Sequence, residues 1–387
     1  MKRLIPLLVL LLAGAVLAAD EMTEVYRRIY LESEGLGQKY SAILNLVGLG
    51  DRETAPVIAE AFSDLLREQS NYGSPSDREL LSRGLRVTAS ALGDYKYTEA
   101  APSLWAAVEQ AADPLARAEA LIALGKVRAA GYAERISLLL RDLNLKPTAD
   151  VDSGEKMAFA AILALEKLRD GRGFAPVFFA TDAWYSQRVR QQAERSLPNI
   201  ADDPTDPIKA IIASETPERI LKALKAEVAS KAAPSRKAEA ALLALKTGHQ
   251  KAPRDKAEER VYGELRKLAL RALITNKAAG AEPVEPCLAS YDRGVDEEER
   301  LLGLSALGVN AGDEAAKALS GVILKLNDEQ RSGVTSELRN RMAKAAVENA
   351  GLTRNKLVRP ALVLVASNDT WSGGIILAAK NAAASIP

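Results

Sequence analysis

The chain has very little of what enzymes and metal sites need. Its 387 residues include one histidine, His249, and one cysteine, Cys287. A zinc site uses three or four Cys or His ligands, and a Ser-His-Asp triad needs a histidine held beside its serine. His249 follows Gly248 in a stretch that reads as a polar linker. We therefore expect no catalytic, cofactor-binding or metal-binding residues and no enzyme activity.

The single cysteine also excludes an intrachain disulfide, so the fold must be stabilised by packing. Cys287 follows Pro286 where a helix is expected to begin. A free cysteine in such a place is more often a small buried apolar residue than a reactive thiol. We expect Cys287 to be buried.

Two short patterns are similar to known sites but incomplete. Ser153 with Lys156, and the later triplet Lys246–Gly248, are similar to motifs of penicillin-recognising enzymes. That fold needs the triplet on a strand, whereas here it ends a helical pattern, and Ser153 is better placed to cap a helix starting near Glu155. The segment 150–154 begins like a calcium loop, but no Glu closes it.

The chain also has few aromatic residues and almost no net charge. Aromatics make up 5% of the chain, and 52 basic and 51 acidic side chains leave a net charge of +1. Ala and Leu dominate the apolar residues, which favours helices over strands. Because basic and acidic side chains nearly cancel, the chain as a whole has no net electrostatic attraction to nucleic acid or to an anionic membrane. Locally, residues 215–280 are rich in Lys and Arg and residues 281–315 in acids, so adjoining patches of opposite sign are expected on solvated helix faces.

One long apolar run stands at the N-terminus. Lys2 and Arg3 precede an apolar stretch from Leu4 to Ala19, and acidic residues follow. This is the order of a secretory signal peptide, and the run is shorter than the roughly 20 residues of a spanning helix. The sequence predicts a signal peptide over 1–18, cleaved after Ala18, and a periplasmic or secreted mature protein. An uncleaved anchor is the alternative.

Beyond this leader, one pattern is repeated: an amphipathic helix, a short turn with Gly or Asp, a second helix and a polar linker. In the clearest copy Asp113 caps a helix, Pro114 takes its first position and Gly125 stands near its C-terminal end. Second helices carry a proline, at Pro56, Pro102 and Pro176. One such pair cannot bury its apolar face alone, so neighbouring pairs must stack.

This rhythm of Asp, Arg, Ala, Leu and Gly, with proline in the second helix, resembles the HEAT-repeat family over most of residues 38–366. The resemblance implies an all-α fold, an α-solenoid of about nine stacked antiparallel helix pairs. It places a single domain over 19–387, with the Ala-rich segment 373–387 capping the last repeat. HEAT-family enzymes that hold iron use paired His-Glu motifs, which this chain lacks.

Candidate partner-binding residues fall into two groups. Trp184, Tyr185, Arg188 and Arg190 gather aromatic and Arg side chains, the types that contribute most to interfaces, although the two aromatics could instead fill the joint between repeats. Lys222 and Lys225 alternate with an apolar stripe of Ile220, Leu221, Leu224 and Val228, and so form a basic face that could hold an acidic partner.

These observations favour an exported, non-catalytic scaffold that binds protein partners in the cell envelope or outside the cell. One alternative is an enzyme-like lyase on HEAT repeats, similar to the bilin-attaching proteins, which a pocket lined by titratable groups would support. A second is a nucleic-acid binder that uses the basic stretch 219–277, as some HEAT-like glycosylases do. The predicted export and the near-zero net charge argue against both alternatives.

Overall fold

The computed structural model describes residues 21–387, so the predicted signal peptide and its cleavage site lie outside the described residues. The described chain is helical and contains no strand, which confirms the predicted all-α class. Residues 21–32 are helical, and the α-helices α2 to α20 follow. Within residues 21–387 this makes twenty helices, or ten pairs, where the sequence predicted about nine.

The contacts divide the chain into two units, residues 1–201 and 202–387. Each is described by itself below. The sequence predicted one domain over 19–387; this division does not test that prediction.

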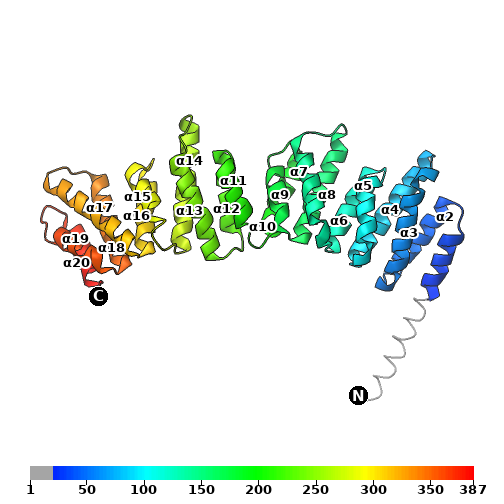
Figure 1. The fold of residues 1–387 in the computed structure, drawn as a ribbon, viewed down its shortest axis with the longest axis horizontal. Helices are drawn as coiled ribbons and strands as arrows, with labels where there is room; N and C mark the ends of the chain where they lie inside the picture. Colours follow the sequence, from blue (N-terminus) through cyan, green and yellow to red (C-terminus); the bar gives the residue numbers. More distant parts are fainter. Residues whose placement is uncertain (1–20) are drawn as a thin grey trace, which may run out of the picture. The chain divides into compact units, whose positions relative to one another are not determined.

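Unit 1 stacks its helices in two layers, in chain order from α2 to α10 (Figure 1). The even-numbered helices pack on one another in succession, and the odd-numbered helices pack against them from one side. The bounds are α2 Leu36–Gly48, α3 Ala55–Glu68, α4 Pro75–Asp94, α5 Ala101–Gln110, α6 Pro114–Lys126, α7 Ala133–Leu145, α8 Val151–Leu168, α9 Phe174–Ala180 and α10 Gln187–Ile200.

Unit 2 has the same arrangement. Helices α12, α14, α16, α18 and α20 form one layer, and α11, α13, α15, α17 and α19 the other. The bounds are α11 Thr205–Ser214, α12 Pro217–Ala229, α13 Pro234–Gln250, α14 Lys256–Thr275, α15 Val284–Arg293, α16 Glu297–Asn310, α17 Asp313–Arg331, α18 Glu337–Thr353, α19 Arg359–Ala366 and α20 Gly373–Ala384. Helix α20 thus covers residues 373–384 of the segment that was expected to cap the last repeat.

Local sequence fixes where the helices begin. The Asp113 carboxylate accepts a hydrogen bond from the Ala116 amide at 3.1 Å, which confirms the predicted cap of α6. Helix α8 differs from expectation: it begins at Val151 and is capped by Asp150, because the Asp150 carboxylate accepts from the Ser153 amide. Ser153 lies in the first turn, where its hydroxyl donates to the same carboxylate.

The prolines of the second helices stand where they cost no hydrogen bond. Pro56 and Pro102 occupy the first turns of α3 and α5, where backbone amides have no partner within the helix. A short 3-10 turn, η1 Arg52–Thr54 or η3 Thr98–Ala100, leads into each. Pro198 is different, because α10 continues through it to Ile200. Only residues 201–204 lie between α10 and α11.

The ends of the even-numbered helices share an unusual backbone. Of the described non-glycine residues, six have left-handed φ angles of 50° to 57°, and each stands one or two residues after the end of an even-numbered helix: Lys96, Arg128, Arg169, Lys277, Ala311 and Arg354. At Arg128 the backbone bonds are those of a Schellman motif, with Ala129 N donating to Leu124 O and Arg128 N to Gly125 O. Glycine is usual at this position, since a side chain costs about 1–2 kcal/mol there.

The repeated glycines serve close packing of neighbouring repeats. Gly125 was expected near the C-cap, but α6 continues past it and turns only at Arg128. A Cβ atom on Gly125 would lie 2.7 Å from Ala164 Cα of α8. The same close approach recurs for three further pairs: Gly93 with Ala123, Gly308 with Asn349, and Gly351 with Ala382. Glycine therefore sets the distance between successive even-numbered helices.

The core consists mainly of Ala and Leu, with Phe62, Phe174 and Phe178 as its largest fully buried side chains. Cys287 is 1% exposed on α15, as predicted, and burial raises the pKa of its thiol to about 12. The thiol is therefore neutral at physiological pH and acts as a small apolar residue.

Candidate functional site

A groove crosses the even-numbered helices of unit 1. It consists of two adjoining hollows of about 810 and 280 Å³ that share Arg86 of α4 and Leu115 of α6. The larger hollow lies over the first half of α4 and the start of α6, and the smaller one extends over α8 to the start of α10. We call the two hollows together the α4–α10 groove.

Two carboxylates fix the walls of this groove. Asp113, the cap of α6, also accepts a hydrogen bond from the Ser82 hydroxyl of α4. Glu155 of α8 accepts from both the backbone amide and the hydroxyl of Ser186, directly before α10. Each carboxylate therefore satisfies polar groups at a helix start and ties that start to the preceding even-numbered helix.

The floor of the groove is apolar and partly open to solvent. Leu81 and Leu85 of α4 are buried beneath the larger hollow. Leu115 is 38% exposed, and Ile122 and Phe159 are partly buried in the smaller hollow. Such a surface can accept apolar side chains of a partner, because covering it removes apolar area from water.

The rim of the groove carries arginines that have no ion pair with any described residue: Arg78 and Arg86 of α4 and Arg188 of α10. The Arg188 guanidinium lies 5.1 Å from the centre of the Phe159 ring, within the range of a cation–π contact. Most carboxylates of the groove are already engaged, since Asp113 and Glu155 hold helix starts and Asp152 pairs with Lys156.

The structure separates the four aromatic and Arg candidates. Arg188 lies in the groove, and Arg190, two residues on, is exposed but does not line it. Tyr185 is only 2% exposed, and its hydroxyl donates to Asn144 Oδ1 at 2.9 Å. Trp184 is partly buried, and its indole N–H donates to Leu143 O at 2.8 Å. The two aromatics therefore fill the joint between repeats, the second of the two interpretations, and do not present a surface to a partner.

The two lysine candidates lie in unit 2, on α12. Lys225 is exposed and Lys222 is partly buried. The predicted apolar stripe is correct for Ile220 and Leu224, which are fully buried. It is wrong for Val228, which is 40% exposed, because Glu227 occupies the packed face beside Leu224 instead. Neither lysine lines the α4–α10 groove.

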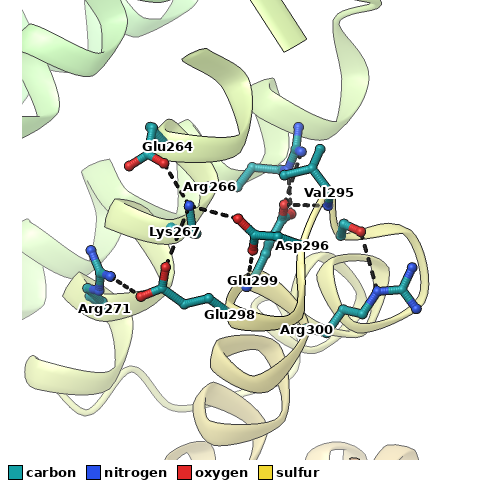
Figure 2. A network of polar contacts seen from close by, with 10 residues as sticks. Glu264, Arg266, Lys267, Arg271, Val295, Asp296, Glu298, Glu299 and Arg300 are labelled. Atoms are coloured by element: carbon teal, nitrogen blue, oxygen red, sulfur yellow. Dashed lines mark hydrogen bonds and ion pairs between the residues drawn. The ribbon is translucent and has the colours of Figure 1, made fainter. Parts of the chain in front are cut away.

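The adjoining basic and acidic stretches pair with each other. Figure 2 shows Lys267 of α14 facing the carboxylates of Glu264, Asp296 and Glu298, with Nζ–oxygen distances of 2.6, 3.0 and 3.6 Å. Arg271 pairs with Glu298 as well. The sequence predicted solvated faces of opposite sign, but here the two signs neutralise each other between α14 and α16.

The centre of this network is buried. Arg266 donates to both oxygens of Glu299 at 2.5 and 3.1 Å (Figure 2). It also donates to Gly248 O at 2.9 Å. Glu299 is 0% exposed, and it also accepts from the Val295 amide at 3.0 Å. Every hydrogen bond named here is internal, so the network joins neighbouring repeats.

The single histidine lies in a helix and not in a linker. His249 is in the last turn of α13, and its Nε2 is 2.8 Å from the Ser290 hydroxyl of α15. Burial, followed by the nearby Arg266 charge, lowers the pKa of His249 to about 4, so the ring is neutral at pH 7. Ser290 is 0% exposed and lines none of the hollows described here.

One buried carboxylate has an unsatisfied oxygen. Glu227 is 0% exposed; one oxygen accepts from the Thr205 hydroxyl at 2.7 Å, and the other has no hydrogen-bond partner. Burial raises the pKa of Glu227, an effect that the Thr205 hydrogen bond only partly opposes. Burial therefore favours the neutral form of Glu227 more than it would be favoured in an exposed carboxyl group.

We expect Glu227→Gln to remove a pH dependence of stability. Because the folded-state pKa is raised, the contribution of Glu227 is fully present below the unfolded-state pKa and is lost as pH rises through the folded-state value. The variant should therefore gain in unfolding free energy, relative to the parent protein, as pH rises. Urea unfolding of both proteins at several pH values measures this difference. Glu218→Gln, an exposed site on the same helix, should show no such trend.

The structure also locates the two incomplete motifs of the sequence, the triplet Lys246–Gly248 and the segment 150–154. Lys246–Gly248 lies in α13 and not on a strand, as expected. Among residues 21–387 no group of three or more His, Cys, Asp or Glu side chains is arranged to hold a metal ion, the segment 150–154 included. In the same range no helix combines the length and hydropathy of a membrane span.

Comparison with known proteins gives structural similarities only. No protein-family model and no curated protein matches the chain. Importin beta aligns over 96% of this chain and 53% of its own length, with 10% identity and a TM-score of 0.40. An engineered protein aligns over 94% and 98%, with 16% identity and a TM-score of 0.35. Human deoxyhypusine hydroxylase aligns over 87% and 98%, with 15% identity and a TM-score of 0.27. The chain spans about half of importin beta, and its assignment to an all-α repeat fold rests on its own helices.

Proposed function

We propose that this chain is a non-catalytic helical-repeat scaffold, with HEAT-like repeats, that binds a protein partner in the α4–α10 groove. The observation that carries the proposal is the groove itself, which combines an apolar floor, partly open at Leu115 and Phe159, with unpaired arginines on its rim. Apolar area surrounded by polar groups is typical of protein-binding surfaces, and Arg and aromatic residues are enriched where binding energy concentrates.

The groove also has a size that suits a segment of protein. It crosses four successive helices, α4, α6, α8 and α10, and packed helices are about 8–10 Å apart. An extended chain advances about 3.3 Å per residue, so on the order of eight or nine residues would span it. The repeat architecture supports this use, because stacked repeats present long continuous surfaces.

The proposal is tested by site-specific photocrosslinking in the cells that make the protein. A photoreactive amino acid at Leu115 should form adducts with a protein partner, because this side chain lies in the groove. Leu138 of α7 is the matched control, since it is the same residue type and is 41% exposed against 38% for Leu115, but lies outside the groove. Equal adduct formation at both sites, or none at Leu115, would contradict the proposal.

We also propose that the scaffold acts outside the cytoplasm. This rests on the sequence of residues 1–18, with its basic start, apolar run and small residues before the predicted cut. Protein recovered from outside the cytoplasm should begin at Ala19 by mass spectrometry. A chain that keeps Met1 and stays in the cytoplasm would count against export without bearing on the groove.

A lyase-like enzyme is the second candidate, because the groove gathers several ionisable side chains. Three of its carboxylates, however, are engaged in helix starts or an ion pair, at Asp113, Glu155 and Asp152. The groove contains neither histidine nor cysteine, the usual general base and a common nucleophile. The nucleic-acid alternative is weakened in a similar way, because much of the basic stretch 219–277 pairs internally, as at Arg236, Arg266 and Lys267.

A further inference from the structure

The carboxyl ends of three successive even-numbered helices form a basic hollow. It is about 640 Å³ in volume and lies in unit 1 at the ends of α4, α6 and α8. Five cations line it, with two carboxylates: Lys96, Lys126, Arg128, Lys167 and Arg169, against Asp94 and Glu166. We call these five cations the basic edge.

Most of these cations are free, whereas the carboxylates are engaged. Lys126 pairs with Asp94 at 2.9 Å. Glu166 accepts hydrogen bonds from Ser196 and Asn199. The other four cations are exposed and have no ion pair with a described residue. The hollow therefore has an excess of positive charge that the chain itself does not neutralise.

The backbone gives an independent reason to regard this charge as functional. Lys96, Arg128 and Arg169 all stand at left-handed positions, with φ of 54°, 56° and 55°. Glycine would fit each position without strain, yet a basic side chain is present in three repeats in a row. A strained backbone conformation that gives no gain in stability or packing is a recognised sign of function.

Helix electrostatics does not account for Arg128 and Arg169. A cation near the carboxyl end of a helix interacts favourably with its dipole. Lys126 and Lys167 already supply that cation in the last turns of α6 and α8, where the backbone is helical and unstrained. The left-handed Arg128 and Arg169 add further charge at the same helix ends.

We propose that the basic edge binds an extended acidic segment of a partner protein. Successive repeats place Lys96, Arg128 and Arg169 about 8–10 Å apart, the spacing of packed helices. Every third residue of an extended chain is separated by about 10 Å, so a carboxylate at every third position can meet one cation per repeat. Arg forms paired hydrogen bonds to carboxylates, which adds geometric preference to the attraction.

A protein segment fits the hollow better than a nucleic acid. Asp94 and Glu166 line the same hollow, and a phosphate chain with a charge on every unit would be brought close to them. No Trp, Tyr or Phe lines it, whereas surfaces for single-stranded nucleic acid stack bases on aromatic rings. The basic edge is a different surface from the α4–α10 groove, and this inference does not depend on the proposed function.

The test compares a glycine variant with the parent protein in two measurements. The full chain carrying Lys96→Gly, Arg128→Gly and Arg169→Gly should keep its Tm or gain a few degrees, because glycine suits the left-handed backbone. Fluorescence anisotropy with a labelled dodecapeptide carrying Glu at every third position should show at least tenfold weaker binding. Lys167→Gln, which changes charge without changing the backbone, should weaken binding by a smaller factor.

Controls separate charge from backbone. Ala311→Gly changes the same kind of backbone position, φ 57°, without a change of charge, and Lys277→Gly removes a left-handed cation in unit 2, outside the basic edge. Both should leave peptide binding unchanged. A large fall in Tm for the triple variant would show that the basic caps are structural and overturn the inference. Unchanged peptide affinity, or tighter and equally variant-sensitive binding of oligothymidylate, would overturn it as well.

Discussion

Replacing Glu299 by Gln is expected to lower the free energy of unfolding of unit 2 by about 3–5 kcal/mol. Glu299 is 0% exposed and holds the Arg266 guanidinium through both of its oxygens. Removing its charge leaves a cation that is 9% exposed in its side chain without a counterion. Urea unfolding of the full chain, followed by circular dichroism, measures the loss.

Glu298 offers a matched control for this prediction. It lies one residue away and also pairs with cations of α14, but its side chain is 52% exposed. Exposed pairs contribute about 0–1 kcal/mol, so Glu298→Gln should change stability little. The paired change Arg266→Met with Glu299→Leu should cost much less than Glu299→Gln alone, because no charge is left buried. Equal losses for the two Gln variants would mean that burial does not decide the effect.

Gly125→Ala is expected to destabilise unit 1 by about 1–3 kcal/mol, although alanine is the better helix former. The new Cβ would lie 2.7 Å from Ala164 Cα and 3.1 Å from Ala164 O. Both are backbone atoms, so α6 and α8 would have to move apart along their contact. Thermal or urea unfolding detects the loss directly.

Gly321→Ala should have the opposite effect and raise the free energy of unfolding. Gly321 lies in the middle of α17, and nothing stands within 4 Å of the position its Cβ would take. The substitution should therefore stabilise by about 1 kcal/mol through helix propensity alone. A stabilising Gly125→Ala would show that the two helices can separate without loss, and that the glycine is not needed for their distance.

Much of the architecture followed from one-dimensional patterns. The cap at Asp113, the prolines in the first turns of α3 and α5 and the buried Cys287 were all predicted correctly. These features depend on residues close in sequence or on the hydrophobicity of a single side chain, so they can be predicted without knowledge of the tertiary structure. Glycine at position 125 was recognised but misread, because its role concerns a helix about 40 residues further on.

The six partner-binding candidates stay predictions. The structure places Arg188 in the α4–α10 groove, buries Tyr185, and puts Lys222 and Lys225 in the other unit. The groove residues Arg86 and Leu115 carried no signal, because each lies in an ordinary amphipathic helix. The basic positions Lys96, Arg128 and Arg169 recur in the sequence at the ends of predicted helices, and that recurrence could have been noticed.

The sequence by itself determined the helical class and the repetition of the helix pairs, because helix propensity, capping and periodicity act over a few residues. It also determined the scarcity of catalytic side chains. Only the tertiary structure decided which charged side chains form ion pairs with each other and which remain unpaired. Arg266 and Arg128 are alike in sequence, yet one lies against Glu299 and the other faces solvent, and that difference arises when distant repeats are packed together.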